Sequence, residues 1–319
     1  MNGRTRRAVG LLALAVSAAV SAAAVAGCGP ASTSAGAAPA VGPVPTVTTV
    51  EQIARPIDQY LVTPEEVATL QSAANALNAT CMREFGLPPV ATDLIGFDEQ
   101  ALRYDRTHAP LYGFFDPARA AVTGYDRLPP ASGPAAPSGA PPSPEAMTVE
   151  HGTDQVGNAV SAYAGKPVPA GGCKGESVRA TGGALPVPDP KALPDHGPGT
   201  PTDDPRVRAA YAAWSGCMKA RGYTYATPLD VLADTGPLPK ATERNGTVTV
   251  EHAPEELKQA ADDVACKLST NLVGIALAVQ CAYDTRYIES HAQALGDYRR
   301  RITDRVRAAA QILQEQGRN

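Results

Sequence analysis

Aromatic side chains are scarce in this chain of 319 residues: Phe, Trp and Tyr make up 5% of it, with a single tryptophan. Glycine and proline are abundant instead, with 29 and 30 copies. A chain with few large apolar side chains and many helix and strand breakers cannot be packed throughout its length. We therefore expect part of it to be loop or tether, and its core to be smaller than the length suggests.

Basic charge is also in short supply, because 28 Lys and Arg residues face 32 Asp and Glu. Three arginines lie within the first seven positions and precede an apolar run from Ala8 to about Ala26. This layout predicts a secretory signal peptide over residues 1–27. Its removal leaves 25 basic residues against 32 acidic ones, a net charge of −7. Nucleic-acid binding needs clustered Lys and Arg, so we expect no nucleic-acid partner.

Sequence motifs of catalysis and cofactor binding are missing as well. The chain has no G-x-S-x-G, no P-loop, no dinucleotide fingerprint, no H-E-x-x-H and no C-x-x-C. Enzymes with a nucleophile elbow, nucleotide-dependent enzymes, zinc proteases and thioredoxin-like proteins are therefore unsupported. We expect no catalytic residues, no cofactor and no metal ligands.

Cys28 stands at the end of the predicted signal, directly after Ala26 and Gly27. Small residues before such a cysteine resemble a bacterial lipobox, in which the thiol receives diacylglycerol and cleavage occurs before the cysteine. Two or more acyl chains give stable membrane anchoring. We expect Cys28 to be the lipid attachment site and the protein to lie at the outer face of the cytoplasmic membrane. The alternatives are an ordinary signal peptide and a membrane span, and Thr5–Arg7 leaves the twin-arginine export route open.

Segments of biased composition divide the remaining chain. Residues 28–50 have the composition of a flexible tether. Residues 129–144 form a Pro-rich insert, in which recurring proline excludes a helix or a central strand, and residues 185–201 form a Pro-rich linker. These boundaries predict a first half-domain over residues 51–184 and a second over residues 202–319.

The two halves share short motifs in the same order. The matching segments are Cys81–Gly86 with Cys217–Gly222, Thr148–His151 with Thr249–His252, and Cys173-Lys174 with Cys266-Lys267. Helical patterns precede the first pair and start at Thr63-Pro64 and Asp204-Pro205, with N-terminal capping signals. The shared order predicts a degenerate duplication. We expect the two Thr-Val-Glu-His segments to form short strands that pair with each other; a metal site at their Glu and His residues is disfavoured, because alternation sends the two side chains to opposite faces.

The repeat also selects a disulfide pairing. Five cysteines follow Cys28, and export makes disulfides permissible. By analogy between the halves, we expect Cys81 to pair with Cys173, and Cys217 with Cys266. The fifth cysteine, Cys281, lies on an apolar helical stripe, so we interpret it as a buried small side chain. An intermolecular bridge is the alternative.

The region from Pro254 to about Gln316 is strongly helical and has no proline after its first residue. A single helix of this length would extend about 90 Å, so we expect a break between Tyr283 and Gly296. The segment Leu272–Val279 is apolar on all faces and should be buried. Beyond it, a seven-residue apolar repeat and an opposite polar face are present: Ile288, Leu295, Ile302 and Ala309, against Arg299, Arg300, Asp304 and Arg305. The stripe either packs on its own domain, which we favour, or forms a coiled-coil seam with a partner.

Further short motifs are spread between Leu70 and Leu313. They are Tyr112-Gly113-Phe114, Asp116, Ala120, Gly124-Tyr125, Val168-Pro169, Gly171-Gly172-Cys173, Gly175-Glu176, Trp214, Cys217-Met218, Gly222-Tyr223, Asp262-Asp263, Cys266-Lys267, Thr270–Gly274 and Ala278-Val279. Together they resemble a family of secreted lipoproteins of high-GC actinobacteria. The resemblance implies an envelope location and a helical, disulfide-linked exported domain, and it implies no particular activity. Cys281 stands where the family pattern leads us to expect a small residue such as Thr or Ala, which favours an unpaired cysteine.

We therefore expect a mainly α protein with a small β component, built from two related disulfide-linked halves and a long C-terminal helical segment. The favoured function is a non-enzymatic, membrane-anchored lipoprotein that binds or organises an envelope partner through its C-terminal helix. A cell-wall or peptide hydrolase is the alternative, with candidate acids by residue type alone: Asp93, Asp98, Glu99 and Asp116. A solute-binding protein is third, because regular strand–helix alternation is absent. The aromatic residues between Arg103 and Tyr125 are expected to form core, with a sugar or peptide pocket as the lesser alternative.

Overall fold

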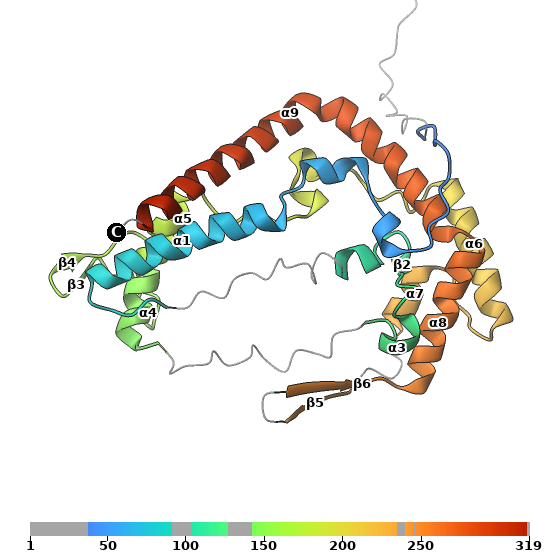
Figure 1. Ribbon diagram of the computed structural model, residues 1–319, viewed down its shortest axis with the longest axis horizontal. Coiled ribbons are helices and arrows are strands. Elements are labelled where there is room, and N and C mark those ends of the chain that lie inside the picture. The colour runs from blue at the N-terminus through green and yellow to red at the C-terminus, as the bar shows by residue number, and fades with distance from the viewer. Residues whose placement is uncertain (1–37, 91–103, 127–141, 235–239, 245–246, 318–319) are drawn as a thin grey trace, which may run out of the picture. The chain divides into compact units, whose positions relative to one another are not determined.

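The computed structural model describes residues 38–90, 104–126, 142–234, 240–244 and 247–317 (Figure 1). The α-helices are α1 (Pro64–Glu84), α3 (Ala120–Thr123), α4 (Pro144–His151), α5 (Gly172–Ala180), α6 (Pro205–Ala220), α7 (Pro228–Ala233), α8 (Pro254–Ser269) and α9 (Leu272–Gln316). Short 3₁₀ helices are η1 (Val50–Gln52), η2 (Pro56–Tyr60), η3 (Pro190–Ala192) and η4 (Pro194–His196). Three antiparallel two-stranded sheets pair β1 (His108–Ala109) with β2 (Gly113–Phe114), β3 (Ala162–Tyr163) with β4 (Lys166–Pro167), and β5 (Lys240–Arg244) with β6 (Thr247–Glu251). The expected mainly α fold with a small β component is confirmed.

The helices α1 and α6 begin and end in the same way. At the start of α1, the Thr63 hydroxyl accepts the Glu66 N–H at 3.2 Å, and the Glu66 carboxylate accepts the Thr63 N–H at 2.9 Å. Asp204 caps α6 in the corresponding position. Both helices are followed by a glycine of positive φ, Gly86 at 73° and Gly222 at 94°. This is the left-handed C-terminal cap that the sequence predicts.

Each of these helices is joined to a later helix by a disulfide. Cys81 of α1 is bonded to Cys173 of α5, and Cys217 of α6 to Cys266 of α8, with 5.6 Å between the Cα atoms of each pair. The pairing predicted from the repeat is confirmed. The loops closed span 92 and 49 residues, and restricting the unfolded chain in this way is worth about 4 kcal/mol for each bridge. Cys281 is unpaired and partly buried.

The Thr-Val-Glu-His segments do not pair with each other, and this expectation is wrong. Thr148–His151 is the second half of α4, whose start is fixed by Ser143: its hydroxyl accepts the Ala146 N–H at 3.2 Å. Thr249–Glu251 does form a strand, but it belongs to β6 and pairs with β5. The Pro-rich insert expected to reach residue 144 ends earlier, because Pro144 is the first residue of α4; residues 129–141 lie outside the described chain.

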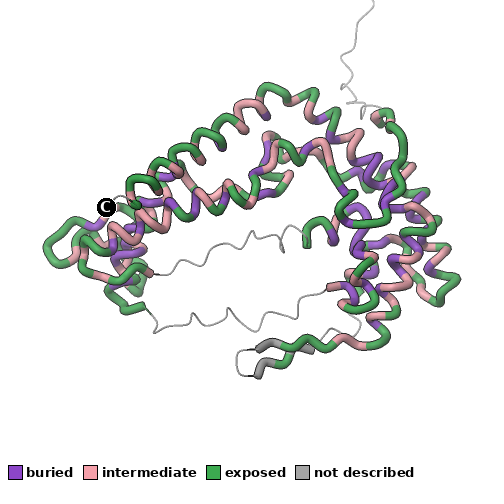
Figure 2. Tube along the Cα trace, viewed as in Figure 1, coloured by how far each residue is buried: buried purple, intermediate pink, exposed green. Residues whose placement is uncertain are grey.

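The largest apolar cluster is built by both halves. Tyr112, Phe114, Phe115 and Tyr125 are at most 5% exposed and pack with Trp214 of α6 and with residues of α8 and α9. Buried positions accordingly concentrate where these helices meet (Figure 2). These four aromatic residues thus form core, as expected, whereas Tyr104 is exposed. The core is shared between the two halves. The chain from Ala38 to Asn319 is one compact unit.

The C-terminal helical region is interrupted twice. α8 and α9 meet at a bend of 63°, where Asn271 adopts a left-handed conformation with φ 50°. This bend was not expected, although asparagine is among the few residues that tolerate such a backbone. Within α9, His291 has non-helical angles (φ −122°, ψ 17°), which confirms the break predicted between Tyr283 and Gly296.

The heptad stripe of α9 is covered by the chain itself. Leu295, Ile302 and Ala309 are at most 4% exposed and pack against η2 and α1. The opposite face is less exposed than expected, because two of its arginines make internal contacts. Arg299 forms an ion pair with Glu66 of α1 at 2.7 Å, and Arg305 donates to backbone carbonyls after α5.

The apolar segment Leu272–Val279 is buried, as the sequence predicts: its side chains, apart from the partly buried Ile275, are at most 8% exposed. Among the described residues, no single helix has the length and apolarity needed to span a membrane. Only the bent pair α8 and α9, taken together, meets these two criteria.

Candidate functional site

Residues 38–54, here termed the strap, form an irregular segment that includes η1 and lies against α9 (Figure 1, blue). The sequence predicts residues 28–50 to be a flexible tether. In the structure, Val47 and Val50 are 3% and 5% exposed, and Val47 and Ile53 belong to the main apolar cluster. The chain is therefore packed into the core from Val47 onward, whereas most residues from 38 to 46 are exposed.

Two side chains fasten the strap through its backbone. Arg206 of α6 donates to the carbonyl of Pro39 at 3.0 Å, and Asn271 donates to the carbonyl of Pro45 at 2.9 Å. The strap approaches α9 so closely at Gly274 that a Cβ on this residue would lie 2.0 Å from the Pro45 carbonyl oxygen. Glycine is required here for the close approach of two backbone segments.

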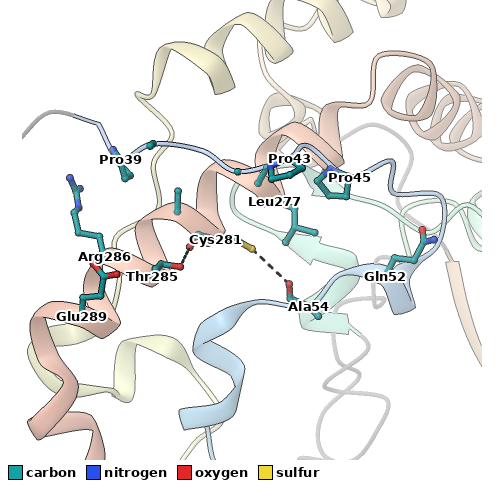
Figure 3. A pocket seen from close by; sticks show the side chains of 14 residues that line it. Pro39, Pro43, Pro45, Gln52, Ala54, Leu277, Cys281, Thr285, Arg286 and Glu289 are labelled. Atoms are coloured by element: carbon teal, nitrogen blue, oxygen red, sulfur yellow. Dashed lines mark hydrogen bonds between the residues drawn. The ribbon is translucent and has the colours of Figure 1, made fainter.

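An open groove of about 680 Å³ lies between the strap and α9 (Figure 3). The strap contributes three prolines and four other residues to it, and α9 contributes four small or apolar side chains followed by Thr285, Arg286 and Glu289. Its principal lining residues are Pro39, Pro43, Pro45, Leu277, Cys281 and Ala282. We consider this groove the candidate functional site, because it is a concave surface lined mostly by apolar groups with polar groups gathered at its ends.

The polar groups of the groove differ between its two ends. Gln52 lies at one end, whereas Arg286 and Glu289 lie at the end where Pro39 enters (Figure 3). The Arg286 guanidinium stacks over the Tyr283 ring, 4.8 Å from its centre. One end of the groove therefore carries a cation and an anion side by side.

Cys281 contributes its thiol to the groove wall. Its Sγ lies 3.9 Å from the carbonyl oxygen of Ala54 (Figure 3). Burial raises the pKa of the thiol, with the nearby Asp284 carboxylate acting in the same direction. Because the thiolate is the reactive form of cysteine, this environment does not activate Cys281 as a nucleophile.

A buried carboxylate on α9, that of Asp284, lies next to the groove wall. Asp284 is fully buried and accepts two hydrogen bonds from Arg55, at 2.9 and 2.7 Å. Gln280 donates to the same carboxylate at 2.9 Å. Bidentate arginine–carboxylate pairs combine charge with fixed geometry, so this contact fixes Arg55, the residue that follows the strap, to α9.

A serine, a histidine and an aspartate meet at the break in α9, but not as a catalytic triad. Ser290 Oγ lies 2.9 Å from His291 Nδ1, and His291 Nε2 lies 3.1 Å from Asp195 Oδ2. In serine hydrolases the serine bonds Nε2 and the aspartate bonds Nδ1, so the order is reversed. The Ser290 hydroxyl also lies 3.0 Å from the Arg286 carbonyl, to which it donates as a helical back-bond. This cluster stabilises the break and offers no activated hydroxyl.

The candidate acids of the hydrolase alternative do not form a described pair. Asp116 is 2% exposed within the aromatic region of the core. Asp93, Asp98 and Glu99 lie outside the described residues. Of the four candidate acids, the described part of the chain thus contains Asp116 alone.

A buried ionic cluster lies beside the Cys217–Cys266 disulfide and was missed by the sequence reasoning. Lys267 donates to Asp263 at 2.8 Å and to the carbonyl of Phe114 at 2.6 Å, and the Trp214 indole donates to Asp263 at 2.9 Å. Both charged side chains are at most 1% exposed. Burial raises the pKa of Asp263 and lowers that of Lys267. The four-residue spacing of Asp263 and Lys267 on one helix face was the available signal.

The two Glu-His pairs lie in different parts of the fold and have different partners. Glu150 is fully buried and accepts from the Asn78 amide at 3.2 Å, whereas His252 lies 3.3 Å from Glu256. Within the described ranges, no three His, Cys, Asp or Glu side chains gather in a way that could hold a metal ion.

Cys28, the predicted lipid attachment site, lies outside the described residues. The four cysteines predicted to form disulfides do so, and they lie on α1, α5, α6 and α8. Comparison of the chain with protein-family models, with curated proteins and with solved structures found no match in any of the three.

Proposed function

We propose that this chain is an exported lipoprotein, anchored through Cys28 at the outer face of the cytoplasmic membrane, and that it acts there as a non-enzymatic binding protein. The observation that carries the proposal is the pair of disulfides, Cys81–Cys173 and Cys217–Cys266, in a chain whose sequence predicts an export signal. Structural disulfides persist mainly in oxidising compartments outside the cytoplasm. The lipobox-like ending of the signal favours the anchored form over a freely secreted one.

The anchor would hold the groove close to the membrane. Ten residue steps separate Cys28 from Ala38, the first residue of the strap. A fully extended chain of this length spans at most about 35 Å. Because the strap is itself one wall of the groove, the groove begins within a short reach of the lipid.

A binding role agrees with the chemistry of the groove. Its volume of about 680 Å³ falls within the range of roughly 300–1,000 Å³ found for small-molecule sites. Its one thiol is not activated. A protein partner at the C-terminal helix, which we also propose, would meet the exposed residues Arg300, Asp304 and Arg307 rather than the covered stripe.

The anchoring is tested by growing cells with a clickable palmitate analogue and comparing the wild-type chain with Cys28→Ala. We expect the wild type to carry the label and to sediment with membranes, and the variant to lose both properties. Wild-type protein that is unlabelled and soluble would contradict the proposal.

The partner is tested with a photo-cross-linking residue at Asp304, and with one at Val122 as an exposed control on α3. An envelope protein captured at position 304, but not at 122 and not from Cys28→Ala cells, is the expected result. Capture that is equal at both positions would contradict a specific surface on α9.

A further inference from the structure

We propose that strand β6 is a self-association edge, through which two copies of this chain join their β5–β6 hairpins into one four-stranded antiparallel sheet. The two β6 strands lie at the centre of this sheet and pair about a two-fold axis at Thr249. The inference depends neither on the proposed anchoring nor on the groove.

The hairpin is a sheet of two strands with free outer edges. β5 and β6 have five residues each, paired from Lys240 opposite Glu251 to Arg244 opposite Thr247 (Figure 1, brown). No other strand in the described part of the chain joins them. A two-stranded ribbon is marginally stable alone, and the N–H and C=O groups along a free edge are a template for a further strand.

The backbone register indicates which groups of β6 are free. Arg244 pairs with Thr247 across two intervening residues, as in a β-turn, where the first carbonyl accepts the last N–H. Neighbouring residues of a strand direct their backbone groups to opposite edges, so Thr249 bonds to β5 as Thr247 does. Val248 and Val250 therefore direct their N–H and C=O groups to the outer edge.

These free groups fit a second copy of the same strand. In an antiparallel pair centred on Thr249, Val248 of one copy lies opposite Val250 of the other, and the reverse. Each of these two valine pairs exchanges both of its N–H···O=C bonds. The strand sequence, Thr-Val-Thr-Val-Glu, is rich in β-branched residues, which favour sheets. Val250 is 39% exposed in the single chain, and the second copy would cover it.

Charge distinguishes this arrangement from other pairings of the same strands. In the antiparallel pair, Glu251 lies opposite Thr247 of the other copy, so no like charges meet. A parallel pair in register would place Glu251 opposite itself. Self-pairing of β5 about Thr242 would place Lys240 opposite Arg244. Like charges directly opposite each other are destabilising. The charged strand β5 thus remains at the outside of the joined sheet, where charged residues protect an edge.

The two-fold pair also closes the assembly. It uses the β6 edge of both copies, whereas pairing of β6 with β5 of another copy leaves a free β6 edge at the end of every row of copies. The contact is short in comparison with stable interfaces, which bury about 1,200–2,000 Å². We therefore expect a weak dimer, which a covalent trap can detect.

The test is disulfide trapping in the full chain carrying Cys28→Ala and Cys281→Ala, with the native disulfides intact. Thr249→Cys places a thiol at the two-fold axis, where paired Cα atoms are about 4.5 Å apart, within the range of a disulfide. Thr242→Cys is the matched control, because it is also exposed and lies directly opposite Thr249 on β5. In a glutathione redox buffer, we expect Thr249→Cys to form the covalent dimer at least about tenfold faster than Thr242→Cys.

Proline substitutions in the Thr249→Cys protein test the hydrogen bonds themselves. Val250→Pro removes an outward N–H of β6 that the hairpin does not use. The dimer loses two hydrogen bonds, which should slow trapping by at least about fivefold. Ala241→Pro removes the outward N–H of β5 opposite Val250 and should leave the rate unchanged.

Equal trapping of Thr249→Cys and Thr242→Cys would overturn the proposal, as would a Val250→Pro effect no larger than that of Ala241→Pro. In a mixture of the two cysteine variants, preferential bridging between position 249 and position 242 would also overturn it, because it would show pairing of β6 with β5. Since the protein used lacks the anchor residue, these outcomes are independent of the labelling of Cys28.

Discussion

Replacing Lys267 by methionine should destabilise the protein strongly, because it leaves a buried carboxylate without its cation. Asp263 is 1% exposed, and after the substitution its hydrogen bond from the Trp214 indole would be the contact that remains of this cluster. The Phe114 carbonyl would lose its lysine donor as well. Removing one partner of a buried ion pair costs about 3–5 kcal/mol. This is a large fraction of the roughly 5–15 kcal/mol by which a folded domain is stable.

Trp214 makes the measurement direct, since the single tryptophan of the chain is part of the cluster. Its fluorescence would be followed during urea denaturation with the disulfides intact, and the free energy of unfolding extrapolated to water. The double variant Asp263→Asn/Lys267→Met keeps an oxygen to accept the indole N–H and removes the buried charge. It should therefore be more stable than Lys267→Met alone, by at least about 1 kcal/mol.

Lys258→Met is the matched control on the same helix. Lys258 also pairs with an aspartate four residues away, Asp262 at 2.6 Å, but its side chain is 69% exposed. Exposed pairs of this kind contribute little to stability, so this variant should unfold close to the wild type. If Lys258→Met and Lys267→Met lose equal stability, or if the double variant is less stable than Lys267→Met, the reasoning from burial is refuted.

Three further predictions concern stability. Gly274→Ala should lower the free energy of unfolding by about 1–3 kcal/mol, because its Cβ would meet the Pro45 carbonyl; an unchanged urea midpoint would contradict the close approach. The hydrogen bond from Arg299 lowers the pKa of Glu66 in the folded protein. The stability that this pair contributes is therefore fully present above the unfolded pKa of about 4.3, and it is lost as the pH falls through the lower folded pKa. Glu66→Gln should therefore cost about 1 kcal/mol at pH 7 and flatten the acid limb of the pH–stability curve, and an acid limb like that of the wild type would count against this pair. Cys81→Ser should cost about 2–5 kcal/mol, and a loss much below this range would mean that the bridge constrains little.

The ends of the helices and the disulfides could be predicted because their signals are local or repeated. Threonine followed by proline and glutamate starts α1, and glycine ends both α1 and α6. A capping residue acts within one helical turn, so a short stretch of sequence contains the whole interaction. The disulfide pairing is long-range, and it became predictable only because Cys81–Cys173 and Cys217–Cys266 occupy matching places in the repeat.

The same four letters, Thr-Val-Glu-His, form a helix in one half and a strand in the other. The difference lies in the flanking residues. Ser143 and Pro144 start α4 ahead of the first copy, whereas Asn245-Gly246 stands between β5 and β6 ahead of the second. An Asn-Gly pair between two short runs is the strongest local signal for a hairpin. The flanking residues, and not the four shared ones, therefore decide the secondary structure of each copy.

Burial of the repeated charges could not be predicted from the motifs either. Lys174 is exposed although it matches Lys267, which is fully buried; Glu251 is exposed although it matches Glu150, which is fully buried. Each outcome depends on which element of the other half covers the position. Phe114, for example, reaches Lys267 across 153 positions in the chain. The duplicated cysteine motifs therefore specify helices and their disulfides, and the partner elements decide where charge is buried.

The groove was out of reach of the sequence for the same reason, since its two walls are separated by more than 200 residues and are joined at Pro45 and Asn271. Its position nevertheless has a direct physical consequence. The strap is secured by buried side chains only from Val47 onward, whereas the groove wall before it is held mainly by hydrogen bonds to Pro39 and Pro45. Polar contacts at a solvent-facing edge open at a smaller free-energy cost than buried apolar ones. A pulling force on an anchor at Cys28 would therefore first displace the part of the strap that forms the groove wall. It would act on the buried side chains from Val47 onward only after this displacement.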